Sequence, residues 1–199
     1  MLGMGIIMDI SIRSMHLSEL EFIFGQITED FAEGEYPPYD KLYKHLKMKK
    51  QTGWILVRDG RDEAYCICTG DPDGYVLVTL LATFREFRGN GNGTIFLKKL
   101  KELYSDAAAI IVEVERVEDA ADEEEAHIRE RRVEFYKRSG FNLIPGIDYT
   151  IWHIPMHLMA LPLKTPFELI CKDIEVIIRE LYLPLLGEHF IHKMEIAKL

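Results

Sequence analysis

A glycine-rich turn between an apolar segment and an amphipathic one limits the folds open to this 199-residue chain more than any other part of its sequence. The run YVLVTLLATF, at 75–84, is typical of a central strand that is buried on both faces. REFRGNGNG follows at 85–93, and TIFLKKLKELY then places apolar residues at helical spacing. A strand therefore passes through a glycine-rich turn into a helix, which suits one α/β domain.

The residues before this turn predict two helices and three further strands. Apolar and polar residues alternate over 9–15, as they do in a half-buried first strand. Ser18 and Glu21 then form a capping-box pattern, which predicts the start of a helix. A second, shorter and basic helix is expected over 39–50. WILVRDG and EAYCICTG, separated by turn residues, predict an antiparallel hairpin over 54–70.

The residues after the turn continue the mixed pattern. AAIIVEVE at 108–115 predicts another interior strand, and the polar run at 116–139 has the acidic start and basic end of one long helix. Gly140 stands where a left-handed C-cap belongs. IDYTIW and MHLMAL predict two closing strands, and residues 164–199 show helical periodicity. We therefore expect a main domain over 1–163 and a C-terminal helical extension over 164–199.

Composition excludes several classes of partner and compartment. The formal charge of −9 argues against nucleic acid, which requires a basic surface, and favours a cationic substrate. The start of the chain lacks the basic region and cleavage site of an export signal, and three cysteines are too few for a disulfide framework. The longest apolar run is about half of the roughly 20 residues that cross a bilayer. We expect a cytoplasmic protein with no membrane partner.

The turn itself indicates an anion site. Exposed backbone N–H groups at a helix start bind phosphate, and glycines permit its close approach. A Rossmann fingerprint needs a third glycine where Thr94 stands, and a P-loop needs a Gly-Lys pair that is absent from this turn. A plain glycine-rich turn is the alternative, because short glycine patterns are weak motifs.

Two blocks resemble the GNAT superfamily of N-acetyltransferases. Arg88 to Gly93, RGNGNG, is similar to the family signature [QR]-x-x-G-x-[GA], which follows the fourth strand. EFYKRSGF at 134–141 is similar to the helix-ending pattern in which a tyrosine precedes a Gly-Phe pair by four residues. The resemblance covers about residues 9–160. It implies a mixed, mostly antiparallel twisted sheet flanked by helices.

The resemblance also implies the cosubstrate and its contacts. Acetyl-coenzyme A would place its pyrophosphate on the turn, Arg88 would fix that turn, and the pantetheine arm would pair with the splayed end of the fourth strand. Two departures weaken the implied affinity: asparagines occupy positions where a basic and an apolar residue are frequent, and an acidic insertion follows the fifth strand. The implied cosubstrate-binding residues are Leu81, Ala82, Thr83, Arg88, Gly89, Asn90, Gly91, Asn92, Gly93 and Thr94.

Two residues are candidates for proton transfer. Tyr136 matches the family tyrosine that acts as general acid towards the departing thiolate, and the alternative is a core aromatic with its hydroxyl at the rim. Glu113, on an otherwise apolar strand, is the candidate base that takes a proton from the amine. Glu115 shares the same face of the strand, because side chains two residues apart point the same way. Either carboxylate is therefore a candidate for the base, acting directly or through water. Both carboxylates are also explained as solvated strand-end residues.

These observations predict an N-acetyltransferase in which a primary amine of a small molecule or peptide directly attacks acetyl-coenzyme A in a ternary complex. The acceptor is not identified. A non-catalytic GNAT-like module that binds coenzyme A or bridges subunits is the alternative, and a nucleotide-dependent enzyme is a third interpretation. The apolar stripe of the C-terminal extension predicts packing on the domain or on a second subunit, which would make a homodimer.

No metal is expected. Cys66 and Cys68 share a strand face without a partner motif, so buried thiols explain them better than a zinc site. His189 and His192 are three residues apart, and surface histidines at this spacing are far commoner than ligands.

Overall fold

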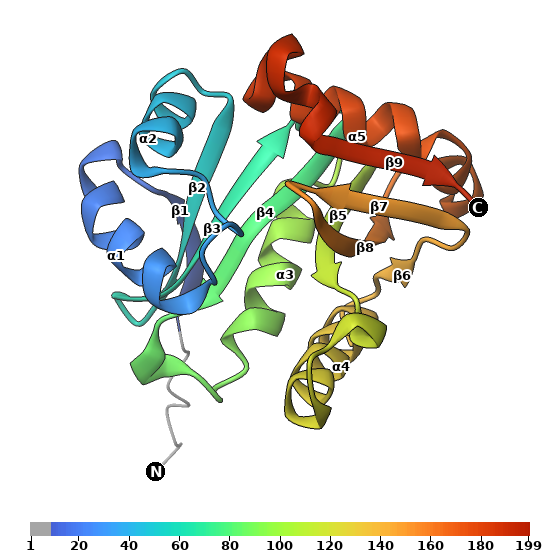
Figure 1. Cartoon of the computed structure of the whole chain (residues 1–199). Coiled ribbons are helices and arrows are strands. Elements are labelled where there is room, and N and C mark those ends of the chain that lie inside the picture. The colour runs from blue at the N-terminus through green and yellow to red at the C-terminus, as the bar shows by residue number, and fades with distance from the viewer. Residues whose placement is uncertain (1–8) are drawn as a thin grey trace.

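A computed structural model describes residues 9–199, so the predicted absence of an export signal falls largely outside the described residues. One mixed sheet of nine strands runs in the order β1-β2-β3-β4-β5-β8-β7-β9, and β6 pairs with β8 (Figure 1). The pairing of β4 with β5 is parallel and the other pairings are antiparallel, which confirms the predicted sheet. The strands are β1 Ile10–Ser14, β2 Gln51–Arg58, β3 Arg61–Gly70, β4 Tyr75–Thr83, β5 Ala109–Glu115, β6 Asn142–Leu143, β7 Ile147–Ile151, β8 Ile154–Pro162 and β9 Met194–Lys198.

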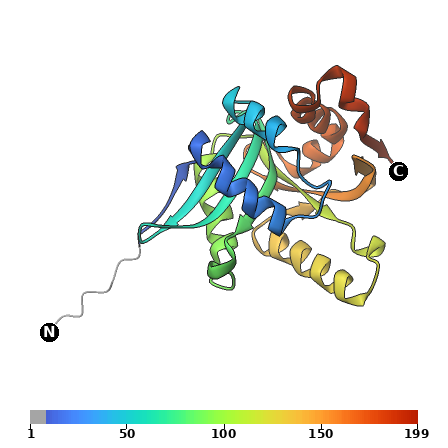
Figure 2. The same cartoon turned by 60° about the vertical axis from the view of Figure 1, so that its left-hand side comes forward.

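Helices cover both faces of this sheet. Alternate residues of a strand point to opposite faces, so Val76 packs with α3 and α4 while Leu77 packs with α5. Helices α1 and α2 pack on the same face as α5, over β2, β3 and β4. Figure 2 shows α4 and α5 on opposite sides of the strands that follow β5. The helices are α1 Leu20–Asp30, α2 Tyr39–Lys47, α3 Asn92–Leu103, α4 Glu123–Arg138 and α5 Phe167–Phe190.

The sheet opens between β4 and β5. These strands pair only as far as Val78 and Val112. In the pairing of β3 with β4, Cys68 opposes Val78 and Ile67 opposes Leu80, which leaves Thr79 as an extra residue in β4. Such a bulge bends a strand and ends its regular pairing. The last residues of β4 and of β5 therefore diverge, and a gap separates the two strands at their carboxyl ends.

Two local predictions require correction or refinement. The capping box at Ser18 and Glu21 is wrong, because a 3-10 turn over Leu17–Glu19 precedes α1. Glu19 Oε2 instead accepts a hydrogen bond from the backbone N–H of His16 at 2.6 Å. The polar run at 116–139 is a 3-10 turn followed by α4, whose N-cap is Asp122. Gly140 has a φ of 94°, as the predicted left-handed C-cap requires.

The C-terminal segment is a helix followed by a strand. Ile170 and Ile174 of α5 are fully buried in a cluster that includes Ile111 of β5. Strand β9 then pairs antiparallel with β7 and forms one edge of the sheet. The predicted helix is present, but the expectation that the extension is helical throughout missed β9. The division at residue 163 stays a prediction; the structure shows that residues beyond it share the core of the sheet.

Candidate functional site

The glycine-rich turn presents its backbone to solvent. Gly89 and Gly91 have φ values of 82° and 75°, which only glycine adopts readily. A Cβ atom added to either glycine would meet nothing within 4 Å. Among residues 9–199, no protein acceptor takes a hydrogen bond from the backbone N–H groups of residues 89–94. The turn and the start of α3 therefore offer free donors to an anion.

Side chains of the turn bond to the body of the protein. Asn92 is only 2% exposed, its Oδ1 accepts from Arg58 Nη2 at 2.5 Å, and its Nδ2 donates to the carbonyl of Phe87 at 3.2 Å. Arg88 Nε donates to the carbonyl of Thr83 at 3.2 Å, and its guanidinium is ion-paired with Asp30. These contacts hold the turn in place and leave the backbone amides for a ligand.

A pocket of about 220 Å³ adjoins the turn. Its wall includes the end of β4, the first turn of α3 and one side of α4. Gly93 lies close to Phe135: a Cβ added to this glycine would be 3.1 Å from Phe135 Cζ, so the ring would have to move by a few tenths of an ångström. The pocket thus brings together residues predicted from separate motifs, and it adds two that were not predicted, Arg132 and Phe135. Its lining consists of Leu81, Ala82, Thr83, Gly93, Arg132, Phe135 and Tyr136.

Tyr136 brings a hydroxyl group to this pocket. Its ring packs against Phe135 and Phe141, and the residue is 8% exposed. Its hydroxyl forms no hydrogen bond with any other residue among 9–199. Burial raises the pKa of the Tyr136 phenol above its ordinary value, so the hydroxyl stays protonated at neutral pH. A buried phenol without a protein partner is available to a ligand.

Glu113 does not line this pocket. It follows Val112, the last residue of β5 that pairs with β4, and accepts hydrogen bonds from the hydroxyls of Tyr149 and Tyr182. Burial raises the pKa of Glu113, and the two phenol donors oppose that rise. No local pattern pointed to these tyrosines, because they lie 36 and 69 positions further along the chain.

Glu115 has different surroundings from Glu113. It is ion-paired with Arg132 of α4, and Arg129 Nε lies 3.9 Å from its other oxygen. The expectation that the two carboxylates share one face of the strand therefore does not describe their contacts. Glu115 faces the arginines of α4, whereas Glu113 faces tyrosines of β7 and α5.

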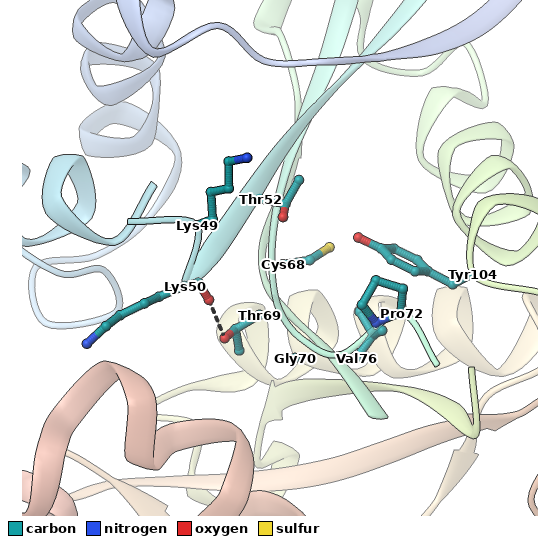
Figure 3. Close-up of a pocket in the computed structure, with 9 residues that line it drawn as sticks. All are labelled: Lys49, Lys50, Thr52, Cys68, Thr69, Gly70, Pro72, Val76 and Tyr104. Atoms are coloured by element: carbon teal, nitrogen blue, oxygen red, sulfur yellow. Dashed lines mark hydrogen bonds between the residues drawn. The ribbon is translucent and has the colours of Figure 1, made fainter. Parts of the chain in front are cut away.

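A second pocket, of about 200 Å³, lies away from the turn (Figure 3). Tyr104, at the end of α3, lines it together with Cys68. Cys66 and Cys68 are buried free thiols with their sulfur atoms 3.4 Å apart. None of the predicted cosubstrate-binding residues lines this pocket.

Metal-binding clusters and membrane-spanning helices are both absent from the described part of the chain. Residues 9–199 contain no group of three or more His, Cys, Asp or Glu side chains arranged to hold a metal ion. Within the same residues, no helix has the length and apolar character that a membrane span requires.

Comparison with solved structures defines the class of fold. A protein described as a GNAT-family acetyltransferase from Bacteroides thetaiotaomicron is 23% identical, with a TM-score of 0.71 over 86% of this chain and 96% of that chain. The ribosomal-protein-S18-alanine N-acetyltransferase of Escherichia coli is 18% identical, with a TM-score of 0.58 over 80% of this chain and 97% of that one. The chain therefore has the GNAT fold.

Another similar structure was solved with ligands. It is the aminoglycoside acetyltransferase AAC(6')-Ib in complex with coenzyme A and kanamycin, which is 18% identical with a TM-score of 0.56. The match covers 77% of this chain and 95% of that one. No protein-family model matches the sequence, and neither does any curated protein.

Proposed function

We propose that this protein is an N-acetyltransferase that moves an acetyl group from acetyl-coenzyme A to a primary amine. One observation carries the proposal: Tyr136, whose hydroxyl bonds to no other residue among 9–199, lines a pocket together with the end of β4 and the start of α3. The free amides of the glycine-rich turn adjoin that pocket. The GNAT fold of the chain and the acetyltransferases that share it support the same activity.

Backbone groups of the turn and of β4 would bind acetyl-coenzyme A. The N–H groups of residues 89–94 would hold the diphosphate of acetyl-coenzyme A, because they converge at the positive end of α3. Residues Leu81, Ala82 and Thr83 pair with β3 but have no strand partner in β5, so those of their backbone groups that point away from β3 are available to the amides of the pantetheine arm. Acetyl-coenzyme A supplies the acyl group as a thioester.

Two proton transfers accompany the chemistry. Glu113 takes a proton from the ammonium form of the acceptor, which frees the nitrogen lone pair to attack the acetyl carbonyl. As the C–N bond forms and the C–S bond breaks, Tyr136 donates its proton to the departing sulfur, and the acceptor nitrogen releases its second proton to solvent. Solvent then reprotonates Tyr136 and takes the proton from Glu113, so one proton is released in each turnover. Glu113 and Tyr136 are associated with opposite faces of the sheet, so the amine would approach from the face that α5 covers.

The acceptor is a small-molecule or peptide amine in this proposal. AAC(6')-Ib was solved with an aminoglycoside, and the enzyme of Escherichia coli acts on an alanine of a ribosomal protein, so the fold accommodates both kinds of acceptor. We place the protein in the cytoplasm, where its three free cysteines would stay reduced. A homodimer also stays a prediction.

Calorimetry and a thiol-release assay test the proposal. Acetyl-coenzyme A should release or absorb measurable heat on binding, and free thiol should appear when a panel of polyamines, aminoglycosides and peptides is added. No binding at millimolar acetyl-coenzyme A would refute the proposal. Binding without thiol release across the panel would favour the non-catalytic module. If nucleotides that lack the pantetheine arm stabilise the protein as much as acetyl-coenzyme A does, a nucleotide-dependent enzyme would be favoured.

A further inference from the structure

The Glu113 carboxylate is held by two phenol groups. Tyr182 Oη lies 2.9 Å from Oε1 and 2.8 Å from Oε2 of Glu113, and Tyr149 Oη donates to Oε1. Tyr149 is fully buried and Tyr182 is 8% exposed. Glu113 itself follows Val112, the last residue of β5 that pairs with β4. Three side chains thus converge at the carboxyl end of β5.

Both tyrosines depend on the C-terminal segment. Tyr182 belongs to α5, and Tyr149 belongs to β7, where it pairs with Ile196 of β9. The position of α5 is fixed on two sides of Tyr182: a side chain at Gly70 would come within 2.7 Å of Leu181, and Lys50 Nζ donates to the carbonyl of Pro184 at 2.7 Å. Residues 164–199 therefore form one wall around Glu113.

The chemistry of these contacts suits a base rather than a structural ion pair. Neither partner of the carboxylate carries a positive charge, so the proton affinity of Glu113 is not suppressed by a salt bridge. Burial and the neighbouring carboxylate raise the pKa of both tyrosines, so they stay protonated as donors. Two O–H donors orient a carboxylate and leave it lone pairs with which to accept another proton.

The remaining groups around Glu113 are apolar or uncharged. Leu158 of β8 stands opposite it in the sheet, and the bulged Thr79 lies just past the paired part of β4. Tyr149 of β7 and Tyr182 of α5 are the titratable side chains that contact its carboxylate within residues 9–199. The glutamate at position 115, two residues along, is ion-paired with α4.

We propose that Tyr182 and Tyr149 are positioning residues that aim Glu113 at the acceptor amine, and that residues 164–199 complete the acceptor side of the site. This inference rests on the proposed acetyltransferase function. It assigns the C-terminal helix and strand a part in the reaction, which the glycine-rich turn and the pocket around Tyr136 do not require.

The first test measures Glu113 directly and needs no acceptor. The carboxyl carbons of glutamate are labelled with ¹³C, the Glu113 resonance is assigned with Glu113→Gln, and its titration is followed by NMR in the wild type and in Tyr182→Phe. Loss of one donor, with the burial unchanged, should raise the midpoint by roughly one pH unit. Tyr149→Phe should act in the same direction. An unchanged midpoint in both variants would overturn the positioning role.

The second test uses the pH dependence of acetyl transfer. Activity that requires ionised Glu113 rises with pH through its pKa, so the acidic limb of kcat/KM should move to higher pH in Tyr182→Phe by the same amount. The KM for acetyl-coenzyme A should stay unchanged. Tyr43→Phe, which removes a tyrosine hydroxyl from α2, is the matched control and should leave the profile in place.

The outcomes separate the two proposals. A wild-type protein that transfers no acetyl group refutes the proposed function and, with it, the role of Glu113 as base. A wild-type protein that transfers acetyl groups, with an acidic limb that Tyr182→Phe and Tyr149→Phe leave in place, refutes only the inference about the tyrosines. Unfolding curves of both variants show whether lost activity reflects lost structure.

Discussion

The guanidinium of Arg88, in the glycine-rich turn, is ion-paired with the carboxylate of Asp30, the last residue of α1. The second oxygen of Asp30 accepts a hydrogen bond from Tyr65 Oη at 2.9 Å, so the carboxylate is anchored to β3 as well. Arg88 also donates to the carbonyl of Thr83 at the end of β4. One arginine thus connects the turn, the helix α1 and the strand that lines the pocket.

Removing the charge of Asp30 should loosen the turn. In Asp30→Asn the ion pair is lost while an acceptor for Tyr65 remains, so we expect acetyl-coenzyme A to bind roughly tenfold more weakly. Calorimetry measures the change. Asp62→Asn, which breaks a surface ion pair with Arg13, is the control and should leave binding unchanged. Equal affinities for Asp30→Asn and the wild type would show that the ion pair does not organise the turn.

A negative charge on the turn should oppose the diphosphate. Gly91 and Gly60 have nearly the same φ, 75° and 76°, and an added Cβ meets nothing within 4 Å at either position. Gly91→Asp and Gly60→Asp should therefore lose similar stability, about 1 kcal/mol each. Only Gly91→Asp should weaken acetyl-coenzyme A binding, by at least roughly tenfold. Comparable affinity in the two variants would place the cosubstrate elsewhere.

Tyr136→Phe should impair chemistry without impairing stability. The hydroxyl has no hydrogen-bond partner among residues 9–199, so its removal costs the fold little, and Tm should stay within a few degrees of the wild type. Loss of a general acid should lower kcat by roughly a hundredfold. Tyr104→Phe, which removes the acceptor of Trp54 Nε1, should show the reverse, a lower Tm with normal turnover. Unchanged kcat in Tyr136→Phe would remove it from the acid role.

Acid should weaken the junction between β1 and α1. Hydrogen bonds from the Arg13 guanidinium lower the pKa of Glu19 to about 2, against about 4.5 for a free glutamate. A depressed pKa contributes stability that is present above about pH 4.5 and is lost as the pH falls towards 2. The Tm difference between wild type and Glu19→Gln should therefore shrink over this range. Glu21→Gln, at an exposed position of α1, is the control and should change Tm little at any pH.

Local patterns in the sequence predicted the parts of the fold whose geometry is set by near neighbours. The β2–β3 hairpin depends on its turn residues. The left-handed cap at Gly140 depends on the absence of a side chain, and the turn at 88–93 depends on glycines beside a helix start. The resemblance of two short blocks to GNAT proteins added the expectation of a mixed, mostly antiparallel sheet. These features were predictable because each depends on a few consecutive residues.

Long-range packing decided the rest. Strand β9 has no strong pattern of its own and is ordered by pairing with β7, and Glu113 and Glu115 are distinguished only by the elements that face them. The bulge at Thr79, which separates β4 from β5, appears only in the register of three strands. Periodicity along the chain specifies which residues share an element, but the surroundings of a carboxylate depend on segments that meet only in the folded protein. For that reason the sequence indicated Glu113 as a base candidate, whereas tertiary structure alone placed Tyr149 and Tyr182 against it.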